Sequence, residues 1–343
     1  MNKKLPLENP IIKYSPEETF TLAILMQKHD EVNDWIYENF IQLHFYNYWE
    51  NMYYGQFFCH REDALFINHE MPLWHKCPWF KCSNIPKELI VKEDTWNFIK
   101  KCIDNDYYLI VCVDPQYISN YEINSSIHEM LIYGYAQDSQ MLYIADFFKN
   151  GVYSQSECNI NEFLDSFYSE NLTSVRYTTN DDFYKLDGKN YDFLNGYQLI
   201  KVSSNVEYKL DLAIVKMLIR DYLTGYDTMA RYNIKKLTNT KVWFGLDIYD
   251  KIIESLSYES EIYEYDVRPF SLLLQHKIFM KKRLEYFCRK KSINIDTSLF
   301  NDLNQMISLA EKILRLYLKF HYNNDNLLIL KIRKILCEIK CKD

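Results

Sequence analysis

Two ionisable residues stand near the ends of an otherwise apolar segment, His128 at its start and Asp146 close to its end. The segment HEMLIYGYAQDSQMLYIADFF (128–148) predicts two strands joined by a turn within AQDSQ. If Gln137 is the centre of that turn, His128 lies opposite Asp146, with the two Cβ atoms about 4.5–5.5 Å apart. A carboxylate at this distance orients an imidazole and stabilises its charged form, as a catalytic histidine requires. The spacing is compatible with acid–base chemistry, whereas the pattern alone favours two polar end-caps of the strands with no chemical role.

A second group of side chains is of the kind that binds zinc. Its members are Cys59, His60, His69, His75, Cys77 and Cys82. Their spacing does not match a standard zinc motif, so we expect no metal here, and a metal-dependent hydrolase is the weaker alternative. A substrate-facing loop and ordinary packing also explain the segment. Trp74 and Trp79 within it are candidates for binding an apolar substrate chain, although such residues lie more often in a core.

The segments that must position these residues carry separate signals. SPEETFTLAILMQK (15–28) starts with Ser-Pro and two acids, which is typical of a helix N-terminus. Apolar spacing predicts further helices over 93–105 and 159–169. YYLIVCVD (107–114) is a continuous apolar run and predicts a central strand. With strands at 128–135 and 141–147, these elements indicate an α+β fold with an antiparallel sheet.

The period of the apolar residues changes after about residue 205. From there on apolar residues recur at helical spacing, and we expect an all-helical region over 206–343, following an N-terminal domain over 1–205. The polar stretch TTNDDFYKLDGKN (178–190) predicts a loop between elements.

Composition excludes several classes of protein. The 343 residues include only 7 glycines and no glycine-rich phosphate loop, so we expect no nucleotide cofactor. A net charge of −7 argues against a dedicated nucleic-acid binder. No apolar stretch reaches the about 18 residues of a membrane span, and the first residues do not resemble a signal peptide. A cytoplasmic location is therefore expected, with the nine cysteines reduced.

IHEMLIYGYAQDSQMLYIADFFKNGVYS, together with NFIQL and CPWF upstream, resembles the N-terminal domain family of butirosin biosynthesis protein H, over about residues 8–200. The resemblance implies a papain-like domain with an antiparallel sheet and an N-terminal helix. It also implies acyl or peptidyl transfer from a carrier-protein thioester, forming an amide in thiotemplated (nonribosomal peptide-type) natural-product biosynthesis. His128 is then the general base and Asp146 its orienting partner.

The sequence departs from that family at the nucleophile. Thr19 stands where the family has a cysteine at the start of the first helix, and Glu18 stands where papain-like enzymes often have a glutamine that donates to the oxyanion. Two hypotheses follow. One is a transferase that uses another nucleophile in place of the cysteine, with Thr19 activated by His128 as the candidate, or that uses none. The other is a catalytically degenerate binding protein that docks a carrier protein, a peptide product or a papain-like homologue, with KKRLEYFCRKK (281–291) as the basic surface for an acidic partner.

Overall fold

The structure is a computed structural model of the chain, and it describes residues 2–49, 52–58, 73–122, 127–172, 196–228, 230, 242–256 and 267–343. The chain forms two compact units, each built from two separate segments. Unit 1 comprises Met1–His29 and Glu70–Glu207, and unit 2 comprises Asp30–His69 and Tyr208–Asp343. The chain divides near residue 205, as predicted, but Asp30–His69 of the predicted N-terminal domain belongs to unit 2 together with the C-terminal segment.

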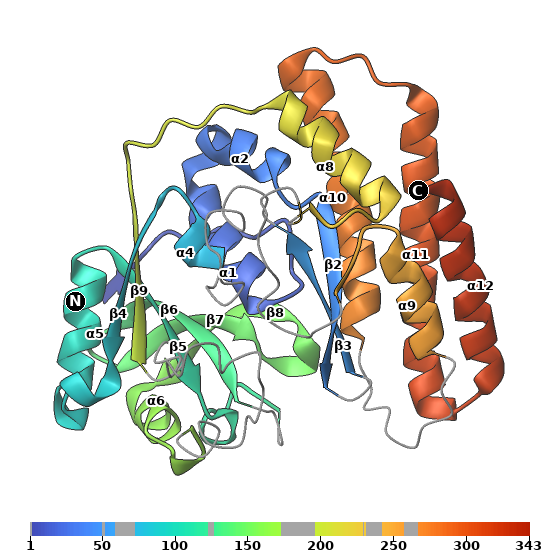
Figure 1. Cartoon of the computed structure of the whole chain (residues 1–343). Helices are drawn as coiled ribbons and strands as arrows, with labels where there is room; N and C mark the ends of the chain where they lie inside the picture. Colours follow the sequence, from blue (N-terminus) through green and yellow to red (C-terminus); the bar gives the residue numbers. More distant parts are fainter. Residues whose placement is uncertain are drawn as a thin grey trace. The chain divides into compact units, whose positions relative to one another are not determined.

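Unit 1 is organised around an antiparallel sheet (Figure 1). Its strands are β1 (Asn2–Lys4), β4 (Phe80–Pro86), β5 (Tyr107–Val113), β6 (His128–Ala136), β7 (Met141–Phe147), β8 (Tyr153–Asn159) and β9 (Gly196–Val202). They lie in the order β4-β9-β5-β6-β7-β8, with β1 added to the far end of β6. Every pairing among the described strands of this sheet is antiparallel, which confirms the α+β prediction.

Helices pack on both faces of this sheet. They are α1 (Pro16–Leu25), α4 (Leu73–Lys76), α5 (Thr95–Asp104) and α6 (Ile160–Phe167), with short 3-10 turns η1 (Met26–Val32), η2 (Lys87–Leu89), η3 (Lys92–Asp94), η4 (Pro115–Tyr117) and η5 (Lys149–Gly151). The predicted helices at 15–28, 93–105 and 159–169 correspond to α1, α5 and α6, and the predicted strand at 107–114 corresponds to β5. The loop predicted at 178–190 lies outside the described residues.

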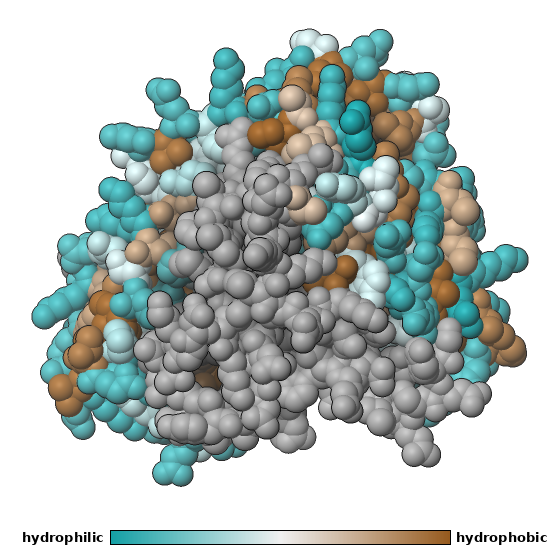
Figure 2. All heavy atoms as spheres, viewed as in Figure 1, coloured by the Kyte–Doolittle hydropathy of each residue, from teal (hydrophilic) through white to brown (hydrophobic). Residues whose placement is uncertain are grey.

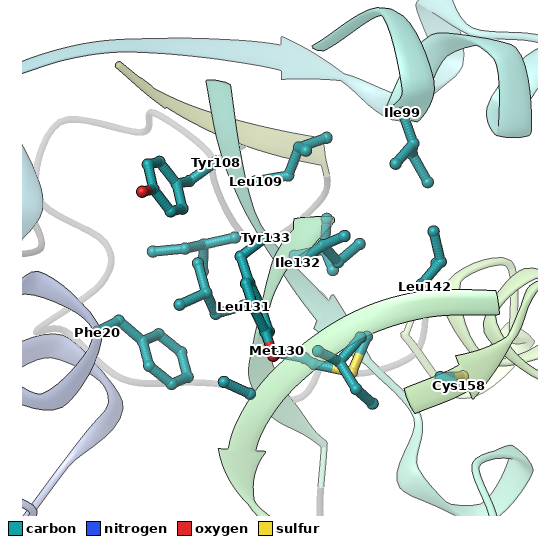
Figure 3. Close-up of a cluster of buried hydrophobic side chains, with 14 of the residues drawn as sticks. Phe20, Ile99, Tyr108, Leu109, Met130, Leu131, Ile132, Tyr133, Leu142 and Cys158 are labelled. Atoms are coloured by element: carbon teal, nitrogen blue, oxygen red, sulfur yellow. The ribbon is translucent and has the colours of Figure 1, made fainter. Parts of the chain in front are cut away.

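Alternation along the strands separates the two faces of the core. Phe20 of α1 lies on the same side of the sheet as Tyr108, whereas Ile99 of α5 lies on the side of Leu109 and Ile132 (Figure 3). Helix α1 is buried nearly all round, since eight of its ten residues are buried. An apolar helix of this kind is typical of a core position and not of a surface.

The β6–β7 hairpin has a different register from the predicted one. Ile132 pairs with Ile144 and not with Leu142, because the turn spans Gln137–Gln140 and the register shifts between Ile132 and Gly134. Such an irregularity inserts an extra residue into one strand. The resulting slip along this part of the hairpin is two residues, an even number, so each side chain keeps its predicted face.

Unit 2 contains a small antiparallel sheet and a set of helices. The strands are β2 (Gln42–Trp49), β3 (Met52–Phe58) and β10 (Val242–Phe244), in the order β10-β2-β3. The helices are α2 (Asn33–Glu38), α8 (Leu212–Thr224), α9 (Asp247–Ser255), α10 (Arg268–Lys291), α11 (Thr297–Asn323) and α12 (Asn326–Lys342). The prediction of an all-helical 206–343 is wrong at β10, where three residues pair with β2 before Gly245, at a φ of +54°, leads into α9.

Two buried cations on α10 have defined roles in unit 2. Arg283 is fully buried and donates to the carbonyl oxygens of Asn39 and Phe40, directly after α2 ends. Lys277 is also fully buried and pairs with Asp343, while donating to the Tyr222 hydroxyl at 2.8 Å. Buried charges require such partners, because desolvation costs several kcal/mol per ion.

No helix in the described part of the chain is long and apolar enough to cross a membrane.

The close approach of β1 to β6 explains why a glycine stands between two tyrosines at position 134, and a substitution there tests this pairing. A Cβ at Gly134 would lie 2.6 Å from Lys3 O and 2.8 Å from a ring carbon of Tyr143, so β1 would have to move. We expect Gly134→Ala to lower the free energy of unfolding by about 1–3 kcal/mol, measured by urea denaturation. Ser139→Ala, in the exposed turn, is the control and should change it by less than about 0.5 kcal/mol. An unchanged Gly134→Ala protein would contradict the pairing of β1 with β6.

Candidate active site

His128 and Asp146 are in direct contact at one end of the sheet in unit 1. His128 Nδ1 lies 2.9 Å from Asp146 Oδ2, and the Asp146 side chain is fully buried whereas that of His128 is 30% exposed. His128 is the first residue of β6 and Asp146 is the last but one of β7, and the two-residue slip makes them diagonal neighbours on one face instead of directly opposed. The expected contact is therefore present despite the wrong register, because both arrangements keep the side chains on the same face.

The Asp146 carboxylate accepts hydrogen bonds at both oxygens. Oδ1 accepts from the Phe147 backbone N–H at 2.7 Å. Oδ2 accepts from the Tyr121 hydroxyl as well as facing His128. Burying a carboxylate without partners is very costly, so these donors are what allows a negative charge at this position.

The charge of Asp146 controls the protonation of His128. Burial by itself lowers the pKa of His128, but Asp146 and, to a smaller extent, Glu129 raise it, and the net value is about 9. His128 Nδ1 also lies 3.0 Å from the Glu129 carbonyl oxygen. Among the described residues Nε2 has no hydrogen-bond partner, so the part-exposed ring presents it to a ligand. The Asp-to-Nδ1 contact is the one that orients the histidine of Ser-His-Asp proteins, in which Nε2 faces the reacting groups.

Aromatic rings connect this pair to the first helix. The ring of Phe147 lies 6.4 Å from that of His128 and 5.8 Å from that of Tyr153, centroid to centroid. Tyr153 in turn lies 6.5 Å from Phe20 of α1. Because Gln27, beyond the other end of α1, bonds to Tyr108 at the start of β5, the N-terminal half of α1 runs toward the end of the sheet that holds His128.

The structure places Thr19 and Glu18 in structural positions on α1. Thr19 is fully buried and its hydroxyl donates to the Ile12 carbonyl oxygen at 3.4 Å, and not to His128. Glu18 is 3% exposed and accepts from the Ser15 hydroxyl, which precedes the helix by one residue. The serine–glutamate spacing matches a capping box, but Ser15 makes no side-chain bond to the helix backbone, and the two side chains bond to each other instead. Thr19 is therefore not an accessible nucleophile in this structure.

The Cys/His segment is only partly described. Cys59, His60 and His69 lie outside the described residues. His75 Nε2 bonds to Gln198 Oε1 at 3.0 Å, and burial lowers the pKa of His75. Among the residues that the structure describes, no group of three or more histidines, cysteines or carboxylates could hold a metal ion.

The two tryptophans proposed for substrate binding lie in the interior. Trp74 is 1% exposed and Trp79 is fully buried. The Trp74 carbonyl oxygen accepts from the Cys82 thiol at 3.3 Å, and the Trp79 carbonyl oxygen accepts from the Ser203 N–H at 2.6 Å. Both residues therefore serve the packing of this region, and neither presents a ring at the surface.

Four described cysteines of unit 1, Cys82, Cys102, Cys112 and Cys158, do not supply a replacement nucleophile. Burial raises the pKa of Cys82 and Cys158 to about 12 and that of Cys102 to about 11, and it also raises that of Cys112 on β5. A thiol is reactive as its thiolate, which such environments disfavour. These thiols behave as small core residues.

Tyr121 is the site residue that sequence reasoning missed. It lies 25 residues before Asp146 in the connection after β5, where no apolar period indicates a contact. The only signal in the sequence is that this connection leads directly into His128, so part of it must lie near the pair.

No protein-family model matches this chain, and a search of curated proteins finds no match either. Functional inference therefore depends on the geometry of the site.

The raised pKa of His128 makes the stability of the protein depend on pH. Because the value is about 9 in the folded state and 6.5 without the partners, the His128–Asp146 pair stabilises the fold fully below pH 6.5, and this contribution is lost as the pH rises to 9. We expect wild type to exceed His128→Gln in unfolding free energy by on the order of 2 kcal/mol at pH 6. The difference should vanish above pH 9. Urea denaturation across this range measures it, and a constant difference would contradict the charged pair.

Proposed function

We propose that unit 1 is a papain-like domain that transfers an acyl or peptidyl group from a carrier-protein thioester to an amine in thiotemplated natural-product biosynthesis. His128 serves as the acid–base group and Asp146 as its orienting partner. One observation carries the proposal: a fully buried carboxylate holds Nδ1 of a histidine whose ring is part-exposed and whose Nε2 is free among the described residues. The family relationship and a cytoplasmic location are parts of the same proposal.

The reaction proceeds as a direct aminolysis. The amine nitrogen attacks the thioester carbonyl carbon, and the neutral Nε2 of His128 takes a proton from that nitrogen as the C–N bond forms. The C–S bond then breaks, and the proton on Nε2 passes to the leaving thiolate, so that His128 ends in the state in which it began. No oxidant or cofactor is required, since the thioester is already an activated acyl group. Orientation of the two substrates supplies the rest of the rate enhancement.

The absence of a covalent intermediate in this mechanism follows from the first helix. The buried Thr19 hydroxyl is bonded to a backbone carbonyl, and a hydroxyl is far less acidic than the thiol that the family pattern has at this position. Direct attack by the amine needs a base but no enzyme nucleophile, which is the chemistry that His128 and Asp146 support.

The carrier protein is the proposed partner, and α12 offers basic side chains in addition to those of 281–291. Within 281–291, Arg283 is buried, while Lys290 and Lys291 pair with acids at positions 30 and 34. Lys282 and Arg289 of the same run form no ion pair with any described residue. Lys331 and Lys334 of α12 are exposed and form no ion pair with any described residue. Brown and teal side chains mix along α11 and α12 (Figure 2), as an acidic partner with an apolar contact would require.

The second candidate is a catalytically degenerate binding protein that retains the papain-like fold. The buried Thr19 and the buried Glu18, which accepts from the Ser15 hydroxyl, favour it, because both residues occupy positions where catalysis in that fold needs an accessible nucleophile and a neutral donor. No contact among the described residues supports a metal-dependent hydrolase that uses the Cys59–Cys82 segment.

The roles of His128 and Thr19 can be separated with a synthetic substrate. We expect wild type to convert a hexanoyl N-acetylcysteamine thioester and a primary amine into the amide. His128→Ala should lose at least about 100-fold in rate, and Thr19→Ala should retain it. Intact-mass spectrometry of wild type, Thr19→Ala and Thr19→Cys reports any acyl-enzyme. An adduct on wild type that disappears in Thr19→Ala would establish a threonine nucleophile and overturn direct aminolysis. No turnover by wild type would favour the binding protein.

The pH dependence of the reaction follows from the charge of His128. The base must be neutral to accept a proton, and with a pKa of about 9 it is mostly charged at neutral pH. The rate of aminolysis, corrected for ionisation of the amine, should therefore rise about tenfold per pH unit up to pH 9 and then level off. Asp146→Asn should move the bend to lower pH, because it removes the negative charge that holds the proton. A profile that falls over this range would contradict a base role for His128.

A further inference from the structure

The connection between β5 and β6 starts and ends at the candidate site. Val113 and His128, the last residue of β5 and the first of β6, pair directly, so the intervening segment leaves the sheet and returns to the same point. Tyr121 lies in this segment and donates its hydroxyl to Asp146 Oδ2, the oxygen that also faces His128 Nδ1. A residue from outside the hairpin therefore shares the carboxylate with the histidine.

The first half of this connection is anchored by Asp114. Its Oδ2 accepts from the Ser169 hydroxyl at 2.6 Å, from Asn171 Nδ2 at 3.0 Å and from Gln116 Nε2 at 2.8 Å. The Ser166 hydroxyl donates to the Asp114 carbonyl oxygen at 2.7 Å. The end of β5 is thereby tied to the C-terminal end of α6.

Further contacts fix Tyr121 itself. Its ring packs edge-on against Phe148 at 4.9 Å, and its N–H donates to the Ile118 carbonyl oxygen at 3.1 Å. The neighbouring Asn120 donates from Nδ2 to the Ser156 hydroxyl on β8 at 2.6 Å. Tyr121 is 8% exposed, so its hydroxyl is directed at Asp146 by packing and not by chance contact at a surface.

We infer that Tyr121 is a positioning residue that limits how strongly Asp146 holds a proton on His128. A carboxylate that accepts an additional hydrogen bond is stabilised in its charged form and is a weaker acceptor for its other donors. Removing the Tyr121 hydroxyl leaves His128 as the remaining hydrogen-bond donor to Asp146 Oδ2 among the described residues. The imidazolium then gains a stronger partner, and His128 becomes a poorer base at neutral pH.

Other ionisable groups surround the pair and remain in place when Tyr121 is changed. They are Glu129 on β6, Cys112 on β5, and Tyr153 and Cys158 on β8. Tyr153 provides a matched control, because its hydroxyl is buried with no hydrogen-bond partner in the described part of the chain and its ring contacts Phe147. Tyr153→Phe removes a hydroxyl from the same region without touching Asp146.

Nuclear magnetic resonance titration of the histidine ring protons tests the inference without an assay of turnover. The chain has 8 histidines, and His128→Gln identifies the signal of His128. We expect Tyr121→Phe to raise the pKa of His128 above its wild-type value by about 0.5–1 pH unit. Tyr153→Phe should leave it unchanged. Tyr121→Leu, which also lacks the donor, gives an independent variant if Tyr121→Phe folds poorly.

An unchanged or lower pKa of His128 in both Tyr121 variants would overturn the inference. The functional meaning of the shift rests on the proposed aminolysis, so the pH–rate profile of Tyr121→Phe is measured beside the titration. A raised pKa with a bend moved to higher pH supports both the inference and the proposed function. A raised pKa with no turnover by any variant, wild type included, supports the tuning by Tyr121 and removes the proposed function.

Discussion

The charge of Asp146 is the constraint on which the site in unit 1 depends. A carboxylate with no exposed surface is tolerated only where donors surround it, and here they come from three places: the adjacent backbone N–H, the first residue of β6 and the connection after β5. Each donor fixes a different part of the structure. The hairpin must bring His128 beside β7, and the β5–β6 connection must return Tyr121 to the sheet. An acid at the end of one strand thus determines the placement of two other segments.

The contact between His128 and Asp146 depends on the register shift in the β6–β7 hairpin. Near the turn, Tyr135 pairs with Leu142, and continuing that register would place His128 and Asp146 on opposite faces. The register shift between Ile132 and Gly134 restores the parity before the strands reach the site. Gly134, at the same point, also leaves room for the backbone of β1. The irregularity and the glycine together let β6 carry three partners, β1 and β7 near the turn and β5 at the site.

Prediction from sequence succeeded where a local period decides the structure. The strand at 107–114 and the helix at 93–105 are set by runs of apolar residues, and the His128–Asp146 contact survived an error in register because the error was even. Long-range pairing is different. Nothing local in VWF indicates that Val242–Phe244 joins β2, nor does the connection after β5 indicate that Tyr121 reaches Asp146. Trp74 and Trp79 could equally line a pocket or fill a core, since the same apolar surface serves both, and only the packing of neighbouring elements decides.

The division of each unit between two separate segments has a consequence for the order in which the chain can fold. Arg283 donates to carbonyl groups near residue 40, and β10 pairs with β2. The segment 30–58 therefore lacks these partners until the ribosome has added some two hundred further residues. At synthesis rates of about 5–20 residues per second, the edge of β2 that pairs with β10 lacks its partner for roughly 10–40 s, although β2 and β3 can already pair with each other. During that time the nascent chain exposes strand edges that other chains can pair with, a risk that continuous domains avoid. For the same reason no single cut of the chain separates the two units. Cleavage near residue 205 would produce an N-terminal fragment that contains all of unit 1 and also β2 and β3 of unit 2, which would then lack the C-terminal helices that pack on them.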